Sequence, residues 1–118
     1  MEFLTVASFI DRHRPEILEK WSELWNSVQR KRPESHFPDP PYDAILAHLP
    51  FDPPYAPPLG DELQNWFNVA PIFCSGAAFC QLQAVSASIL IHEQYEERGD
   101  ILAALENSLE AMSLEAGT

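Results

Sequence analysis

The sequence predicts an all-α fold, a small helical bundle in which residues 1–118 form a single domain. Apolar residues recur every three or four positions in several segments, which is the spacing of amphipathic helices. No segment alternates apolar and polar residues over a useful length, so a sheet is not expected. With 118 residues, of which 46% are hydrophobic, the chain can bury a core but is too short for a multidomain enzyme.

Two helices are expected to meet at Pro15. Apolar residues from Phe3 to Ile10 predict a short first helix that ends near Arg12–Arg14, because proline inside a helix removes a backbone hydrogen bond. Proline suits the first turn of a second helix, which Pro33 ends. The apolar stripe of this second helix contains Ile17, Leu18, Trp21, Leu24, Trp25 and Val28, and we expect its tryptophans in the core.

The middle of the chain is rich in proline. Nine of the eleven prolines lie between Pro33 and Pro58, so residues 33–60 cannot form one helix. We expect this irregular segment to wrap around the bundle, with one short helix at Tyr42–Leu49. After it, Asp61 is the expected N-cap of a helix that Pro71 interrupts.

Two longer helices are expected after Pro71. The first runs from about Gly76 to Arg98, with Gly99 as the residue that closes it. The second follows at once, with Asp100 as its N-cap. The sequence stops at Leu114–Thr118 with no helix-breaking residue beyond Gly117, as expected if this last helix was cut from a longer protein.

The charge of the chain is strongly negative. Eighteen acidic residues against seven basic ones give a net charge of −11, which disfavours binding to nucleic acid or to an anionic membrane surface. Arg30, Lys31 and Arg32 are placed favourably at a helix C-terminus and do not make a nucleic-acid site. Because no secretory signal precedes the first helix, we expect a cytoplasmic protein whose two cysteines, Cys74 and Cys80, are reduced and buried.

Thirty consecutive residues, Leu63–His92, contain no Asp, Glu, Lys or Arg. A membrane span would fit this length, but the many Asn, Gln and Ser residues and the lack of flanking basic clusters argue against it. We expect instead a helix buried on both sides, one against its own core and the other against a second copy of the chain. A core helix within a monomer is the alternative. The interface expected in the dimer comprises Phe79, Leu82, Val85 and Ile89 with Leu102, Leu105, Leu109 and Met112.

The sequence contains no catalytic motif and no spacing typical of a metal site, so neither an enzyme nor a metalloprotein is expected. His92 follows the apolar face of the long helix, where a haem ligand can sit. The simpler interpretation of His92 is a buried or boundary histidine with one hydrogen bond. We therefore expect no cofactor.

The opening FLTVASFIDRHRPEILEKWSEL resembles the start of the N-terminal domains of RsbR-type co-antagonists, which also precede bacterial sensor histidine kinases. The shared pattern is an apolar pair, a joint rich in His and Arg, and then I-L-x-x-W. Its residues are Phe9, Ile10, His13, Arg14, Ile17, Leu18 and Trp21. The second half is similar at Gly76, Leu82, Ile89, Leu90 and the stretch ILAALENSLEAM from Ile101 to Met112. The resemblance covers residues 2–115, and the proline-rich residues 33–60 depart from it.

The resemblance implies a dimeric, globin-like input domain without haem, which passes a signal through its last helix, Asp100–Met112, to an output domain. We therefore expect a non-catalytic sensory or regulatory domain of a histidine kinase or a stress-response co-antagonist. The runner-up is an acidic adaptor or chaperone-like module that holds a basic partner with residues 37–58. A globin-like sensor that binds haem or another small ligand is the third alternative.

Overall fold

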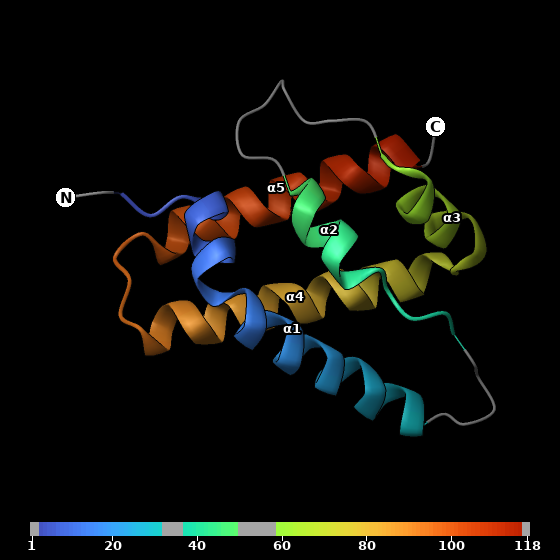
Figure 1. Cartoon of the computed structure of the whole chain (residues 1–118), viewed down its shortest axis with the longest axis horizontal. Coiled ribbons are helices and arrows are strands. Elements are labelled where there is room, and N and C mark those ends of the chain that lie inside the picture. Colours follow the sequence, from blue (N-terminus) through green and yellow to red (C-terminus); the bar gives the residue numbers. More distant parts are fainter. Residues whose placement is uncertain (1–2, 32–36, 50–58, 117–118) are drawn as a thin grey trace.

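Five α-helices make up most of the part of the chain that the computed structural model describes, residues 3–31, 37–49 and 59–116 (Figure 1). The helices are α1 (Val6–Lys31), α2 (Tyr42–His48), α3 (Asp61–Val69), α4 (Ile72–His92) and α5 (Arg98–Ala116). No strand occurs in these residues, so the all-α prediction is confirmed for them.

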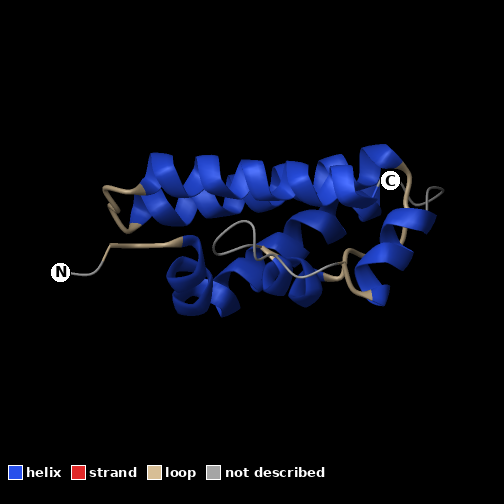
Figure 2. Cartoon of the chain, turned by 90° about the horizontal axis from the view of Figure 1, so that it is seen from above, coloured by secondary structure: helices blue, strands red, loops and turns tan. Residues whose placement is uncertain are grey.

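The helices are arranged in two layers (Figure 2). The helices α4 and α5 follow each other through a short turn and lie side by side, while α1, α2 and α3 pack on one face of this pair. The shortest dimension of the molecule is 19 Å, the thickness of two helices. The described residues therefore leave the other face of the α4–α5 pair uncovered.

One hydrophobic core receives side chains from all five helices. Its largest fully buried members include Trp21 of α1, Leu46 of α2, Leu82 of α4 and Leu105 of α5. Trp21 is 0% exposed and Trp25 is 3% exposed, which confirms that both tryptophans belong to the core.

The helix α1 is continuous, whereas the sequence predicts two helices that meet at Pro15. Phe9 and Ile10 before the proline and Ile17 and Trp21 after it are all buried in the same core. Burial of each such side chain contributes about 1.5–3 kcal/mol, so together they outweigh the ~3 kcal/mol cost of an interior proline. The helix bends instead of ending, and its first turns run at an angle to the rest (Figure 1).

The described part of the proline-rich segment, residues 37–49, is tied to α1 by side-chain hydrogen bonds. The Gln29 amide donates to the carbonyl oxygen of Phe37 at 2.7 Å, and the Trp25 indole N–H donates to the Asp39 carboxylate at 3.1 Å. The short helix that the sequence predicts here is confirmed as α2. Residues 33–36 and 50–58 of the expected wrapping segment lie outside the described residues.

The helices α3 and α4 begin earlier than the sequence predicts. Gly60, not Asp61, occupies the N-cap of α3, so Asp61 is the first helical residue. Pro71 precedes α4, which starts directly at Ile72 and not near Gly76. This early start has a simple reason, since proline fits a helix N-terminus and residues 72–75 include nothing that breaks a helix.

The end of α4 differs most from the prediction. The helix ends at His92, and the chain turns through Gln94, whose φ angle is 60°. The Tyr95 N–H donates to the carbonyl oxygen of Leu90 and the Gln94 N–H to that of Ile91, both at 3.0 Å. These two bonds form a Schellman motif, in which a glycine usually occupies the position of Gln94.

Gly99 therefore does not close α4 as predicted but lies in the first turn of α5, which begins at Arg98. The Ile101 N–H donates to the carbonyl oxygen of Glu97 at 2.9 Å, so Glu97 takes the N-cap position predicted for Asp100. Asp100 lies in the first turn of the helix, where a carboxylate is favourable to the helix dipole.

Candidate functional site

The helix α4 has a buried face and an exposed face, and neither is charged. Its buried residues are Cys74, Ala78, Phe79, Leu82, Val85, Ser86, Ile89 and Leu90. On the opposite side every fourth residue is exposed or half-buried without carrying charge, namely Ile72, Gly76, Cys80, Ala84 and Ser88. Residues four apart on a helix follow one another with a shift of about 40°, so these five form a strip of roughly 24 Å that winds partly around α4. We call this strip the outer stripe of α4.

A groove of about 850 Å³ runs between the outer stripe of α4 and α5. Cys80 and Ala84 line it from α4, and Leu102 is among the residues that line it from α5. Glu106 and Glu110 are its two charged lining residues, both on α5. Neither carboxylate has an ion-pair partner within the described chain. The groove is thus largely uncharged, with an acidic edge on α5.

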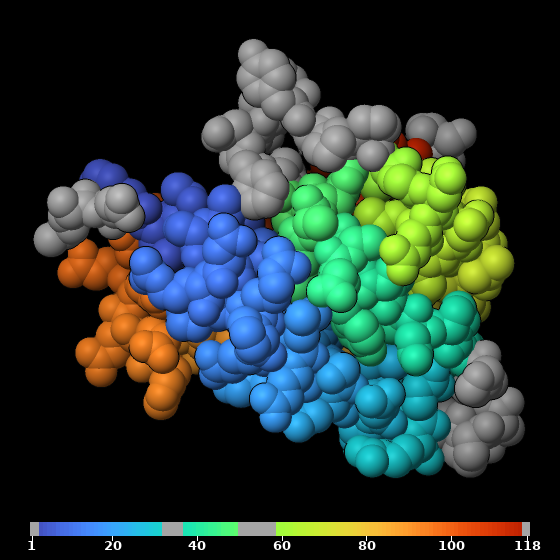
Figure 3. Space-filling model, in the orientation of Figure 1, coloured from blue at the N-terminus to red at the C-terminus, as the bar shows by residue number. Residues whose placement is uncertain are grey.

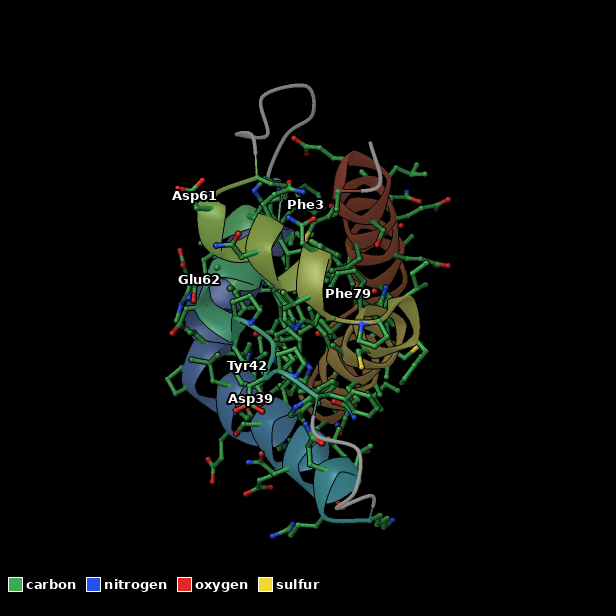
Figure 4. All side chains as sticks on the ribbon, turned by 90° about the vertical axis from the view of Figure 1, so that its right-hand side faces the viewer. Phe3, Asp39, Tyr42, Asp61, Glu62 and Phe79 are labelled. Carbon is green, nitrogen blue, oxygen red and sulfur yellow. The ribbon has the colours of Figure 1, made fainter. Side chains whose placement is uncertain are left out.

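The opposite face of the bundle is formed by α1, α2 and α3, which Figure 3 shows from the front. Acidic side chains lie exposed on this face too. Asp61 and Glu62 occupy the outer edge of α3, away from α4 and α5 (Figure 4). This face has no uncharged strip comparable to the outer stripe of α4 among the described residues, so the uncharged surface and the groove mark one side of the molecule.

Most residues predicted for a dimer interface pack inside the single chain. Phe79 is 9% exposed and contacts Trp66 and Phe67 of α3 at ring-centroid distances of 6.2 and 6.0 Å (Figure 4). Six others are at most 4% exposed: Leu82, Val85, Ile89, Leu105, Leu109 and Met112. Leu102 is half-buried in the groove. A second copy would therefore meet the outer stripe of α4 and the groove, because the large apolar side chains already fill the chain's own core.

The helix α1 borders the other side of the outer stripe. Lys20 and Leu24 line a second hollow of about 400 Å³ together with Ala84 and Ser88 of α4. Leu24 is 42% and Val28 41% exposed, although the sequence places both in the inward stripe of their helix. Glu23 lines the same hollow, so this edge of α1 presents apolar side chains and charged side chains of both signs to solvent.

His92 and Cys80 are exposed, which differs from the predictions for them. His92 is the last residue of α4 and lines neither the groove nor the hollow beside α1. A haem ligand has to face a cavity, so the geometry gives no support to that role. Both cysteines are free, as expected, and Cys74 is buried as expected. Burial raises the pKa of the Cys74 thiol.

A polar network connects α1 to the turn before α5. The Tyr95 hydroxyl accepts a hydrogen bond from Arg12 at 3.0 Å and lies 3.1 Å from Nε2 of His13. Nδ1 of His13 lies 3.5 Å from a carboxylate oxygen of Glu16. The hydrogen bond from Lys20 to Glu16, 3.0 Å long, is the main cause that lowers the pKa of this carboxyl, and His13 adds to it. The start of α5 is thereby held against α1.

In the described part of the chain, α4 is the one helix long and apolar enough to cross a membrane. Eight of its residues are packed into the core, and central helices of soluble proteins have the same length and composition. Among the described residues, no cluster of three or more His, Cys, Asp or Glu side chains is arranged to hold a metal ion.

Comparison with protein families, curated proteins and solved structures finds no match to this chain. The function proposed below is therefore supported by the chain's own residues and their arrangement.

Proposed function

We propose that the chain is a non-catalytic sensory or regulatory domain that forms a homodimer and passes a signal through α5. The observation that carries this proposal is the uncharged outer stripe of α4, which no described helix covers. Helices that are apolar on all sides are normally buried on all sides. A second copy that covers the stripe would complete this burial.

The composition of the stripe suits close contact between helices. Gly76, Cys80, Ala84 and Ser88 are small, so the backbone of a partner helix can approach within the 8–10 Å typical of packed helices. The groove beside the stripe adds the apolar side chain of Leu102. Charged residues are depleted at the centre of stable interfaces, and this stripe carries none.

The role of α5 in passing a signal is supported by its position. The helix α5 forms one wall of the groove. Tyr95, in the connection just before α5, contacts Arg12 and His13 of α1 through its hydroxyl group. A change in the groove or in the contacts of Tyr95 would therefore shift the start of α5. The resemblance to the RsbR-type co-antagonists and histidine kinases, and the globin-like fold it implies, belong to this proposal.

Sedimentation equilibrium between 1 and 100 μM tests the dimer. The wild-type chain is expected to sediment as a dimer, and Ala84→Arg, which places a large cation on the stripe, is expected to sediment as a monomer. Ala47→Arg is the matched control, because Ala47 is exposed on α2 in the other layer. A wild-type chain that is monomeric at 100 μM would refute the proposal.

A second candidate is an acidic adaptor that holds a basic partner. Glu106 and Glu110, which are exposed and without ion-pair partners in the described chain, favour it. Residues 50–58 of the segment expected to hold such a partner lie outside the described residues. If a basic peptide binds the wild-type chain but not the Glu106→Gln/Glu110→Gln variant, and the chain stays monomeric, the adaptor function is preferred.

A further inference from the structure

Two complementary surfaces lie on the same chain. Along the exposed edge of α1, Lys20, Leu24, Val28 and Lys31 follow one another at spacings of four, four and three residues, which places them on one face of the helix. Leu24 and Val28 are 42% and 41% exposed. We call these four residues the basic edge of α1. Between its two lysines the helix also carries Arg30 and a single carboxylate, Glu23, so this stretch has a positive balance.

The groove between α4 and α5 has the opposite character. Its lining is apolar or uncharged except for Glu106 and Glu110, which stand one helical turn apart on α5. Its α5 wall runs from Gly99 to Ser113, roughly 21 Å, and the basic edge of α1 is roughly 16 Å long. The edge therefore fits the groove in length, in its apolar centre and in the sign of its charge.

The two surfaces flank the same strip of α4. Ala84 lines the groove on one side and the hollow beside Lys20 and Leu24 on the other. The outer stripe of α4 thus lies between the basic edge of α1 and the acidic edge of α5. Within one chain α4 separates the two edges, so they cannot meet each other.

The arrangement of a symmetric dimer follows from this order. A twofold axis parallel to α4 brings the basic edge of each copy against the groove of the other, and both contacts are then of opposite charge. A twofold axis across α4 instead brings Glu106 and Glu110 against their own copies, which is unfavourable. The charges therefore select the first arrangement, in which the two α5 helices run parallel.

We infer that the groove between α4 and α5 is completed by the basic edge of α1 from a second copy of this chain, reciprocally in a parallel dimer. This inference rests on the proposed dimeric function and names the contact that forms it. Lys20 and Lys31 of one copy lie beside the Glu106 and Glu110 edge of the other, while Leu24 and Val28 cover the apolar floor. Lys20 can leave Glu16, or contact Glu16 and a carboxylate of the other copy together, because the ion pair between Lys20 and Glu16 is exposed.

Charge reversal on each surface tests the inference. One variant carries Lys20→Glu and Lys31→Glu, and the other carries Glu106→Lys and Glu110→Lys. Each is expected to weaken the dimer at least about tenfold, because like charges then face each other in both contacts. An equimolar mixture of the two variants is expected to form heterodimers, since both of its contacts again pair opposite charges. Native mass spectrometry identifies the heterodimer directly, even where one variant is less stable alone.

A matched control reverses two carboxylates elsewhere. Asp61→Lys/Glu62→Lys changes the net charge by the same amount as the reversal in the groove, but on the outer edge of α3 (Figure 4). This variant is expected to remain dimeric. If the wild-type chain is a dimer that neither reversal weakens, or if the mixture gives no heterodimer, the contact is wrong while the dimeric function stands. If the wild-type chain is monomeric, both proposals fail.

Discussion

Replacing Gln94 with glycine is expected to stabilise the protein. The φ angle of 60° puts this residue in the left-handed region, which costs a residue with a side chain about 1–2 kcal/mol. Glycine avoids that strain but loses about 0.5–1 kcal/mol through the greater freedom of the unfolded chain. The balance is a gain of about 0.5–1 kcal/mol, because the two backbone hydrogen bonds of the Schellman motif do not involve the side chain.

Urea unfolding followed by tryptophan fluorescence, at one protein concentration, measures this gain as a higher midpoint with an unchanged slope. The neighbouring substitution Glu93→Gly is the control, since Glu93 has a φ angle of −81° and no strain to release. It is expected to destabilise the protein by about 0.5–1 kcal/mol. If both substitutions destabilise equally, the left-handed turn at Gln94 is not the source of strain that the geometry indicates.

Three other predictions concern buried groups. The hydroxyl of Ser86 is buried without a hydrogen-bond partner in the described chain. Ser86→Ala should therefore stabilise the protein by about 1 kcal/mol more than Ser88→Ala, the control at an exposed position of the same helix. Equal effects of the two substitutions in urea unfolding would contradict this. Burial, helped by Asp39, raises the pKa of Tyr42 to about 12. Because the folded-state pKa lies above that of the unfolded chain, the protein should lose stability as the pH rises from about 10 to 12, and Tyr42→Phe should reduce that loss in thermal melts. A thiol-reactive dye should modify the exposed Cys80 quickly and Cys74 only on unfolding, and equal rates in native buffer would refute the burial of Cys74.

The presence and order of the helices follow from the sequence because apolar residues at a period of 3.6 need a helix to reach one core. Helix ends are less predictable. Gly99 is typical of a closing residue, yet Gln94 closes α4, where two backbone hydrogen bonds form despite the cost of its left-handed conformation. Likewise Pro15 does not end α1, because the side chains before and after it are buried in one common core.

The candidate site is only half predictable. The uncharged stretch marks α4 as an unusual helix, but a helix apolar on all sides gives no sign of which face meets its own core. Leu82 and Ile89 turn inward while Gly76 and Ala84 remain outside, but size does not decide the face, because Ile72 is exposed and Ala78 is buried. The sequence also does not predict the basic edge of α1, because Leu24 and Val28 have the spacing of core residues and are nevertheless exposed.

Cysteine cross-linking along the outer stripe of α4 tests the parallel dimer most directly. In a Cys80→Ser background, Gly76→Cys, Ala84→Cys and Ser88→Cys each introduce one thiol at a different position along the stripe. A twofold axis parallel to α4 brings the positions that face it near their own copies, within the 4.4–6.8 Å between Cα atoms that a disulfide needs. Ala84 and Ser88 lie about 40° apart around the helix and can face one axis together, whereas Gly76 lies about 120° from Ser88. We predict disulfide-linked dimers for Ala84→Cys and Ser88→Cys under mild oxidation, and none for Gly76→Cys. Cross-linking at one position alone would indicate an axis across α4, and no cross-linking at any position would contradict a dimer formed by this face.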